Sequence, residues 1–78
     1  MQKYMNTGRK SGVEEFEIGE DYILIKYFKT PKLYKYSYAS AGKEKVEKMK
    51  ELALSGQGLN GYINRVAEFE YEDGGSVP

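Results

Sequence analysis

The chain has 78 residues with 12 basic and 12 acidic side chains, and it contains neither cysteine nor histidine. That length corresponds to a single domain. Disulfide and thiolate chemistry are excluded, and the usual general base and the commonest metal ligand are missing. We therefore expect a protein that is not an enzyme, with no catalytic residues, no metal site and no cofactor. No apolar run approaches the roughly 20 residues that cross a bilayer, so we expect a cytoplasmic protein without membrane association.

The first strands are expected after a polar segment. Residues 1–12 mix polar and small side chains without a period, which predicts a flexible N-terminal arm. Residues 13–18 alternate, so that Phe16 and Ile18 would face a core while glutamates face water. Residues 22–29 are rich in aromatic and β-branched side chains and are partly apolar on both faces, which predicts a central strand.

A hairpin is predicted next. Residues 33–38 alternate, with tyrosines on one face, and they follow the central strand after a short connection that contains Pro31. Proline fixes φ at a value that suits a turn, and two strands joined in this way form a hairpin. We expect either the tyrosine face or the face that begins with Leu33 to join the core.

Two helices are predicted after the hairpin. Over residues 41–55 the apolar side chains recur at helical spacing, with Ser40 as the N-cap and Gly56 as a left-handed residue at the C-terminus. A second, short helix would have Asn60 as its N-cap. Its apolar face is indicated by the spacing of Leu59, Tyr62, Ile63 and Val66.

One more strand completes the predicted fold. Residues 66–71 change to a period of two, which predicts an acidic strand, and residues 72–78 read as a flexible C-terminal tail. The chain would thus be a single α+β domain over residues 13–71, in the order β-β-β-α-α-β. We expect an antiparallel sheet of three to four strands, with one long and one short helix packed on one face. The expected core includes Phe16, Ile18, Val46, Met49, Leu52, Ala53, Leu59, Ile63 and Phe69.

Charge is segregated along the chain although the net charge is zero. Residues 13–21 carry five acidic side chains, residues 22–50 carry eight lysines against two glutamates, and residues 66–78 carry four acidic side chains. Opposite charges on paired strands stabilise a sheet. We therefore expect acidic outer strands to pair with basic neighbours.

Three segments carry a family resemblance. They are the strand 23–28, the aromatic-x-aromatic strand 33–36 and the Gly-Leu-Asn-x-Tyr-Ile-Asn segment at 58–64. Together they resemble the KTSC domain, a small module found at the C-terminus of some lysyl-tRNA synthetases. The chain departs from the family pattern at residues 37–40, where the family tends to have a Val-Pro turn, and it continues into residues 66–71. The resemblance implies a domain without a settled biochemical role, and its synthetase connection hints at RNA.

Two functional interpretations stay open. The first is a small non-enzymatic binding module, with a protein partner or a homodimer formed through an acidic sheet edge. The alternative is an accessory domain for RNA or single-stranded nucleic acid, because lysines neutralise phosphates and tyrosines stack on bases. Its candidate residues on the basic, aromatic hairpin are Lys26, Lys29, Lys35, Tyr34 and Tyr36. Against this alternative, the tyrosines would belong to the sheet core and the lysines would only solubilise the hairpin.

The segment from Gly58 to Arg65 is a second candidate site. Backbone N–H groups at the start of a helix bind anions, and an arginine adds bidentate contacts to phosphate or carboxylate. The candidate residues are Asn60, Tyr62, Asn64 and Arg65. Alternatively, the asparagines serve the turn backbone and Arg65 pairs with Glu68 or Glu70.

Overall fold

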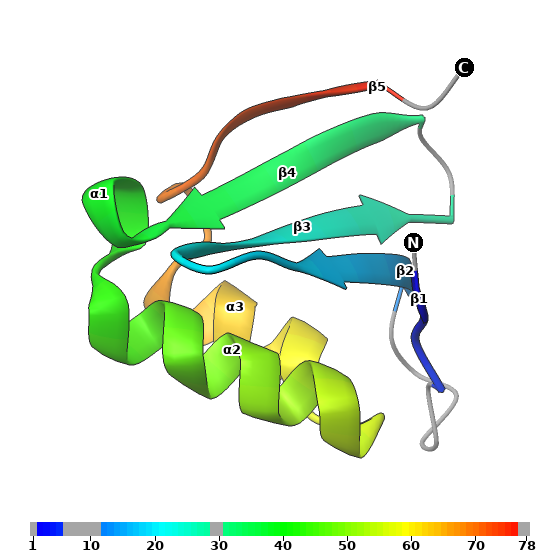
Figure 1. The fold of residues 1–78 in the computed structure, drawn as a ribbon. Coiled ribbons are helices and arrows are strands. Elements are labelled where there is room, and N and C mark those ends of the chain that lie inside the picture. The colour runs from blue at the N-terminus through cyan, green and yellow to red at the C-terminus, as the bar shows by residue number, and fades with distance from the viewer. Residues whose placement is uncertain (1, 6–11, 29–30, 77–78) are drawn as a thin grey trace.

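A β-sheet forms one layer of the molecule and helices form the other (Figure 1). The structure, a computed structural model, describes residues 2–5, 12–28 and 31–76. Within these residues the sheet has five strands, all paired antiparallel in the order β1-β2-β3-β4-β5. The strands are β1 (Gln2–Lys3), β2 (Val13–Ile18), β3 (Tyr22–Tyr27), β4 (Lys32–Ser37) and β5 (Glu72–Ser76). The predicted α+β class is confirmed, with more strands than expected.

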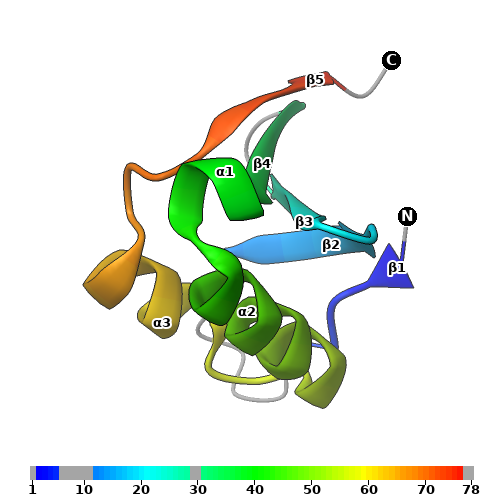
Figure 2. The same ribbon diagram turned by 60° about the vertical axis from the view of Figure 1, so that its left-hand side comes forward.

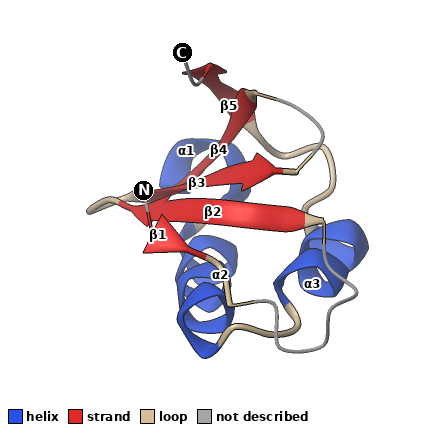
Figure 3. Cartoon of the chain, turned by 90° about the vertical axis from the view of Figure 1, so that its right-hand side faces the viewer, coloured by secondary structure: helices blue, strands red, loops and turns tan. Residues whose placement is uncertain are grey.

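The helices cover one face of the sheet. They are α1 (Tyr38–Ala41), α2 (Lys43–Ser55) and α3 (Leu59–Val66). Figures 2 and 3 show α2 and α3 side by side beneath β2 and β3, with β5 far from them. The facing sheet residues Ile23 and Ile25 are buried, and the register places them opposite Tyr36 and Tyr34. The tyrosine face of β4 is therefore the core face.

Strand β2 contains a β-bulge, so its side chains do not alternate between the two faces as predicted. Its register shifts between Val13 and Glu15, where two residues of β2 lie against one of β3. An extra residue of this kind breaks strict alternation, so Val13 and Phe16 are both buried. Ile18, which was expected in the core, is 37% exposed at the strand end.

The prediction of a flexible arm over residues 1–12 is wrong for residues 2–4. Residues 2 and 3 form β1, which pairs with β2 opposite Phe16 and Glu15. Tyr4 is only 4% exposed, and its ring packs edge-on against Phe16 with centroids 6.4 Å apart. The expected flexibility of residues 6–11 lies outside the described residues. A single aromatic residue in a polar run has no period, so the sequence does not signal this anchor.

The start of the long helix also differs from the prediction. Ser40 does not cap α2, because it lies inside the short helix α1, which is capped by Ser37. The Ser37 hydroxyl accepts a hydrogen bond from Ser40 N–H, and the Ser40 hydroxyl accepts one from Ser37 N–H, which is a capping box. Gly42, with φ of 96°, separates α1 from α2. Gly56 ends α2 in the left-handed conformation, as predicted.

The last strand is not where the alternation predicted it. Residue 66 is the end of α3, and the acidic strand predicted at 66–71 is replaced by β5 at 72–76, where a flexible tail was expected. The helical spacing prevails because Leu59, Ile63 and Ala67 are all buried against the core. Phe69, expected in the core, is 82% exposed in the turn that follows.

The core lies between the sheet and the two longer helices. Nonpolar and aromatic residues from every layer contribute to it, and of the predicted members Leu52 is only half-buried. The buried residues are Tyr4, Val13, Phe16, Ile23, Ile25, Tyr36, Ala41, Val46, Met49, Ala53, Leu59, Ile63 and Ala67. No helix in the described part of the chain is long and apolar enough to cross a membrane.

Candidate functional site

The face of the sheet opposite the helices is the main candidate surface. Side chains alternate along a strand, so residues next to buried Ile23 and Ile25 point away from the helical layer. The two longer helices, α2 and α3, lie on the other side (Figure 3). We call this surface the open face, and its central residues, all half-buried, are Tyr22, Leu24, Lys26, Leu33 and Lys35.

A shallow depression lies on the open face between β3, β4 and β5. Its lining residues are Tyr22, Leu24, Lys35, Asp73 and Gly74. The Lys35 ammonium lies 5.0 Å from the centroid of the Tyr22 ring, which is within the range of a cation–π contact. The depression thus combines an aromatic ring, an aliphatic floor and a cation, with residues 73 and 74 of β5 along one side.

A glycine of β5 lies directly against the floor of this depression. The register of β5 against β4 shifts between residues 32 and 34. A Cβ atom added to Gly74 would lie 3.0 Å from a methyl carbon of Leu24 and 3.0 Å from the Leu33 carbonyl oxygen. Any larger residue here would therefore have to displace the strand or the Leu24 side chain.

Charges on the open face are compensated across the strands, as the charge segregation predicted. The Lys26 ammonium forms an ion pair with Glu14 on β2. The register also places Glu15 opposite Lys26 and Glu72 opposite Lys35. The basic strands β3 and β4 therefore lie between the more acidic β2 and β5. The face as a whole is not a strongly basic surface.

The candidate residues of the hairpin are divided between the two faces of the sheet. Lys26 and Lys35 belong to the open face, whereas Tyr34 and Tyr36 point toward the helical layer. Tyr36 is only 2% exposed, and Tyr34 packs edge-on against Tyr27 and Tyr71. Lys29 lies outside the described residues. The lysines and tyrosines proposed from the sequence do not share one surface.

Burial and hydrogen bonding keep several tyrosines protonated. Desolvation raises the pKa of the Tyr36 phenol well above its ordinary value, and the nearby Tyr27 phenol adds to the increase. Burial also raises the pKa of Tyr27. The pKa of Tyr38 is raised chiefly because its hydroxyl donates to Glu47 Oε2, at 2.6 Å. These shifts move the phenols away from the pH range in which a general base operates.

The Gly58–Arg65 segment forms the turn before α3 and most of the helix itself. Its N-cap is Gly58, in the left-handed conformation, and no side chain caps the helix, so the prediction of Asn60 as N-cap is wrong. The Leu59 N–H donates instead to the Tyr4 hydroxyl, at 3.3 Å. Because that N–H is already used, this helix start offers less to an anion than the sequence suggested.

The remaining candidates of this segment lie along α3. Tyr62 is half-buried against the core, and Asn64 and Arg65 are exposed. Within the described residues Arg65 forms no ion pair, and Glu70 instead pairs with Lys45 at 2.5 Å. Asn64 and Arg65 are therefore consecutive exposed residues of α3, and no ion pair among the described residues joins Arg65 to an acidic group.

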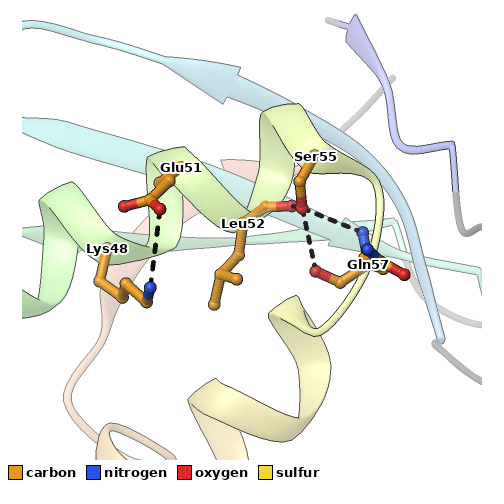
Figure 4. Close-up of polar contacts among 5 residues, drawn as sticks. All are labelled: Lys48, Glu51, Leu52, Ser55 and Gln57. Atoms are coloured by element: carbon orange, nitrogen blue, oxygen red, sulfur yellow. Dashed lines mark hydrogen bonds and ion pairs between the residues drawn. The ribbon is translucent and has the colours of Figure 1, made fainter.

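The turn between α2 and α3 satisfies its own polar groups (Figure 4). The Ser55 hydroxyl donates to the Leu52 carbonyl at 2.8 Å, and Gln57 N–H lies 3.4 Å from the Ser55 hydroxyl oxygen. Leu52 points from α2 toward α3, while Lys48 and Glu51 form an exposed ion pair of 3.7 Å. The glycine-rich stretch is thus a structural joint between two helices.

Sequence reasoning missed most residues of the depression. Tyr22 and Leu24 were recognised only as the second apolar face of a central strand, which is the one signal that could have found them. Asp73 and Gly74 were assigned to a tail, and nothing in the local sequence indicates that they return to the sheet beside β4.

No group of three or more carboxylate, histidine or cysteine residues in the described ranges is arranged to hold a metal ion. Comparison of the chain with protein-family models, with curated proteins and with solved structures gives no match.

Proposed function

We propose that this protein is a small non-enzymatic binding module whose partner docks on the open face of the sheet. The observation that carries the proposal is the position of α2 and α3 on one side of the sheet, so that no described helix covers half-buried Tyr22, Leu24 and Leu33. Aromatic and aliphatic residues of this kind act as anchors in binding surfaces. A cytoplasmic location, expected from the sequence, belongs to the same proposal.

The depression offers a partner both an apolar contact surface and polar groups that fix the partner's orientation. Ligand sites combine mostly apolar walls with a few well-placed polar groups. Here Tyr22 and Leu24 provide the apolar part, and Lys35, which lies opposite Glu72 of β5, provides a charged group at the rim. A protein segment that carries an apolar side chain beside polar groups fits this pattern.

The proposal is tested by capturing partners with a tagged protein and comparing variants. Tyr22→Ala and Lys35→Glu alter the open face, and Lys48→Glu makes the same charge change on the exposed surface of α2. We expect a partner that the wild type and Lys48→Glu retain and that both open-face variants lose. The proposal fails if the folded open-face variants retain every bound species.

Nucleic acid is a second candidate, favoured by one observation. The Lys35 ammonium and the Tyr22 ring lie together on the open face, so a phosphate and a base would find a cation and an aromatic ring side by side. The pairing of Lys26 with Glu14 weakens this candidate. Binding of single-stranded RNA at low salt that falls steeply as salt increases would support it, and an unchanged fluorescence anisotropy of labelled RNA would rule it out.

A partner at a sheet edge is supported less well. Both acidic strands were expected at edges, but β2 is flanked by β1 and β3. Within the described residues the edge strands are β1 and β5, of which β5 is acidic. That edge carries Glu72 and Asp73 and a register shift, and acidic residues and bulges protect edges against pairing. Sedimentation over a concentration series tests a homodimer, and a monomer at high concentration argues against it.

We also propose a relation to the KTSC domain as a hypothesis. It is supported by the order of two strands, a long helix and a Gly-Leu-Asn-containing segment, which here correspond to β3, β4, α2 and α3. An experimental structure of a KTSC domain tests it. A different order of these elements in that domain would remove the relation.

A further inference from the structure

Two tyrosine rings contact the side-chain ammonium of one lysine. The three side chains lie on the helix-facing side of the sheet, beside the edge strand β5. Tyr34 lies on β4 and Tyr71 immediately precedes β5, two segments that run side by side in Figure 1. Their ring centroids are 4.7 Å apart and the ring planes form an angle of 79°. The Lys32 ammonium lies 5.2 Å from the Tyr34 centroid and 5.4 Å from the Tyr71 centroid. We call Tyr34 and Tyr71 the tyrosine pair.

The rings of the tyrosine pair are held in place by packing beneath them. Tyr71 contacts buried Tyr36 with centroids 6.0 Å apart, and Tyr34 contacts Tyr27 with centroids 5.4 Å apart. Both members of the pair are themselves half-buried. Contacts other than those with Lys32 therefore support both rings, which favours a site preorganised for a cation.

The chemistry of the pair selects an ammonium group. The face of an aromatic ring attracts a cation within about 6 Å of its centroid. Here both rings lie within that distance of the same ammonium group. Strand β5 adds one negative charge, because Asp73 lies opposite Tyr34 and so shares its face of the sheet. The surroundings thus favour a cationic ligand and disfavour an anionic one.

We propose that the tyrosine pair is a binding site for a quaternary ammonium group, and that Lys32 occupies it in the absence of ligand. A primary ammonium is strongly hydrated, whereas a quaternary ammonium has no N–H groups to leave unpaired on an aromatic ring. An external ligand therefore has a better group for the site, and Lys32 has the advantage of tethering, which gives it a high effective concentration.

The test is a titration with tetramethylammonium chloride, followed by the NMR signals of the tyrosine rings. Lys32→Met removes the competing charge and keeps an unbranched side chain. We expect site-specific binding that is roughly two- to fivefold tighter in Lys32→Met than in the wild type, the factor for a contact of about 0.5–1 kcal/mol. Tyr71→Leu should lose the binding, and Tyr62→Leu, a change at a half-buried tyrosine of α3, should retain it.

Two further arms decide the outcome. Choline and a peptide with trimethyllysine show whether the quaternary ammonium group belongs to a small molecule or to a protein. Tighter binding of either ligand than of its neutral carbon analogue supports the proposed site. Sodium chloride and the neutral analogue are the controls. The proposal is overturned if the Tyr34 and Tyr71 signals respond equally to the controls in Lys32→Met, or if Tyr62→Leu weakens binding as much as Tyr71→Leu. The tyrosine pair does not belong to the open face. If the proposal of a partner on the open face fails, the result of this titration is unaffected.

Discussion

At the scale of single residues, Ser37 connects three parts of the chain. It is 6% exposed at the end of β4, where its hydroxyl accepts a hydrogen bond from Ser40 N–H and donates one to Glu72 Oε2 at 2.5 Å. One side chain thus caps α1 and fixes the start of β5. This contact joins the start of β5 to the end of β4.

We expect Ser37→Ala to reduce the free energy of unfolding by about 1–3 kcal/mol, because it removes an N-cap and a charge-assisted hydrogen bond. Urea unfolding measures the change. Ser55→Ala is the matched control, since Ser55 is an exposed serine that bonds only to nearby backbone, and it should cost less than about 0.5 kcal/mol. Equal losses in the two variants would contradict this role for Ser37.

Buried phenols make stability depend on alkaline pH. The pKa values of Tyr36 and Tyr27 are raised above the ordinary 10.0, with burial as the largest cause. A raised pKa in the folded state contributes stability that is fully present below the ordinary pKa and is lost as the pH rises through the folded pKa.

We therefore expect the protein to unfold at a pH above 10.0, together with ionisation of these phenols. Ultraviolet absorbance of the phenolate and circular dichroism should change in one transition, and Tyr36→Phe should shift it to higher pH. If every tyrosine ionised near its ordinary pKa while the fold persisted, the burial argument would be wrong.

At the scale of elements, α3 begins with a hydrogen bond from a distant part of the chain. Gly58 supplies no capping side chain, and the Leu59 N–H donates to the hydroxyl of Tyr4, which follows β1. Tyr4→Phe keeps the ring and leaves that buried N–H without its acceptor.

We expect Tyr4→Phe to reduce the free energy of unfolding by about 1–3 kcal/mol, which is the penalty for an unsatisfied buried polar group. Amide hydrogen exchange should localise it to the first turn of α3. Tyr62→Phe removes the hydroxyl of a half-buried tyrosine on α3 itself and serves as the control. Unchanged exchange at Leu59 in Tyr4→Phe would show that the contact contributes nothing.

The sequence predicts those elements whose own pattern is strong. The β3–β4 hairpin, the main helix α2 and the short helix α3 follow from alternation and helical spacing, and all are present. Strands β1 and β5 could not be predicted, because each is held by distant residues, β1 through Tyr4 against Phe16 and β5 through Glu72 on Ser37. The candidate site shares this limit, since Asp73 and Gly74 reach the depression only through β5.

At the scale of the whole molecule, the one-sided placement of the helices is the feature that points to binding. The sheet has a buried face with Ile23, Ile25 and Tyr36, and an open face on which lysines of β3 and β4 alternate with Tyr22, Leu24 and Leu33. Acidic residues of the flanking strands balance these lysines, as with Glu14 and Lys26. A surface that is partly apolar and electrically balanced suits a protein segment better than a nucleic acid.

Site-specific photo-cross-linking in cells tests this central claim most directly. A photoreactive residue is placed at Lys35 on the open face and, in a separate protein, at Lys48 on α2. A discrete partner cross-linked from position 35 and absent from position 48 is the result that the open-face proposal predicts. Cross-linking of the same partner from position 48, with none from position 35, would contradict it.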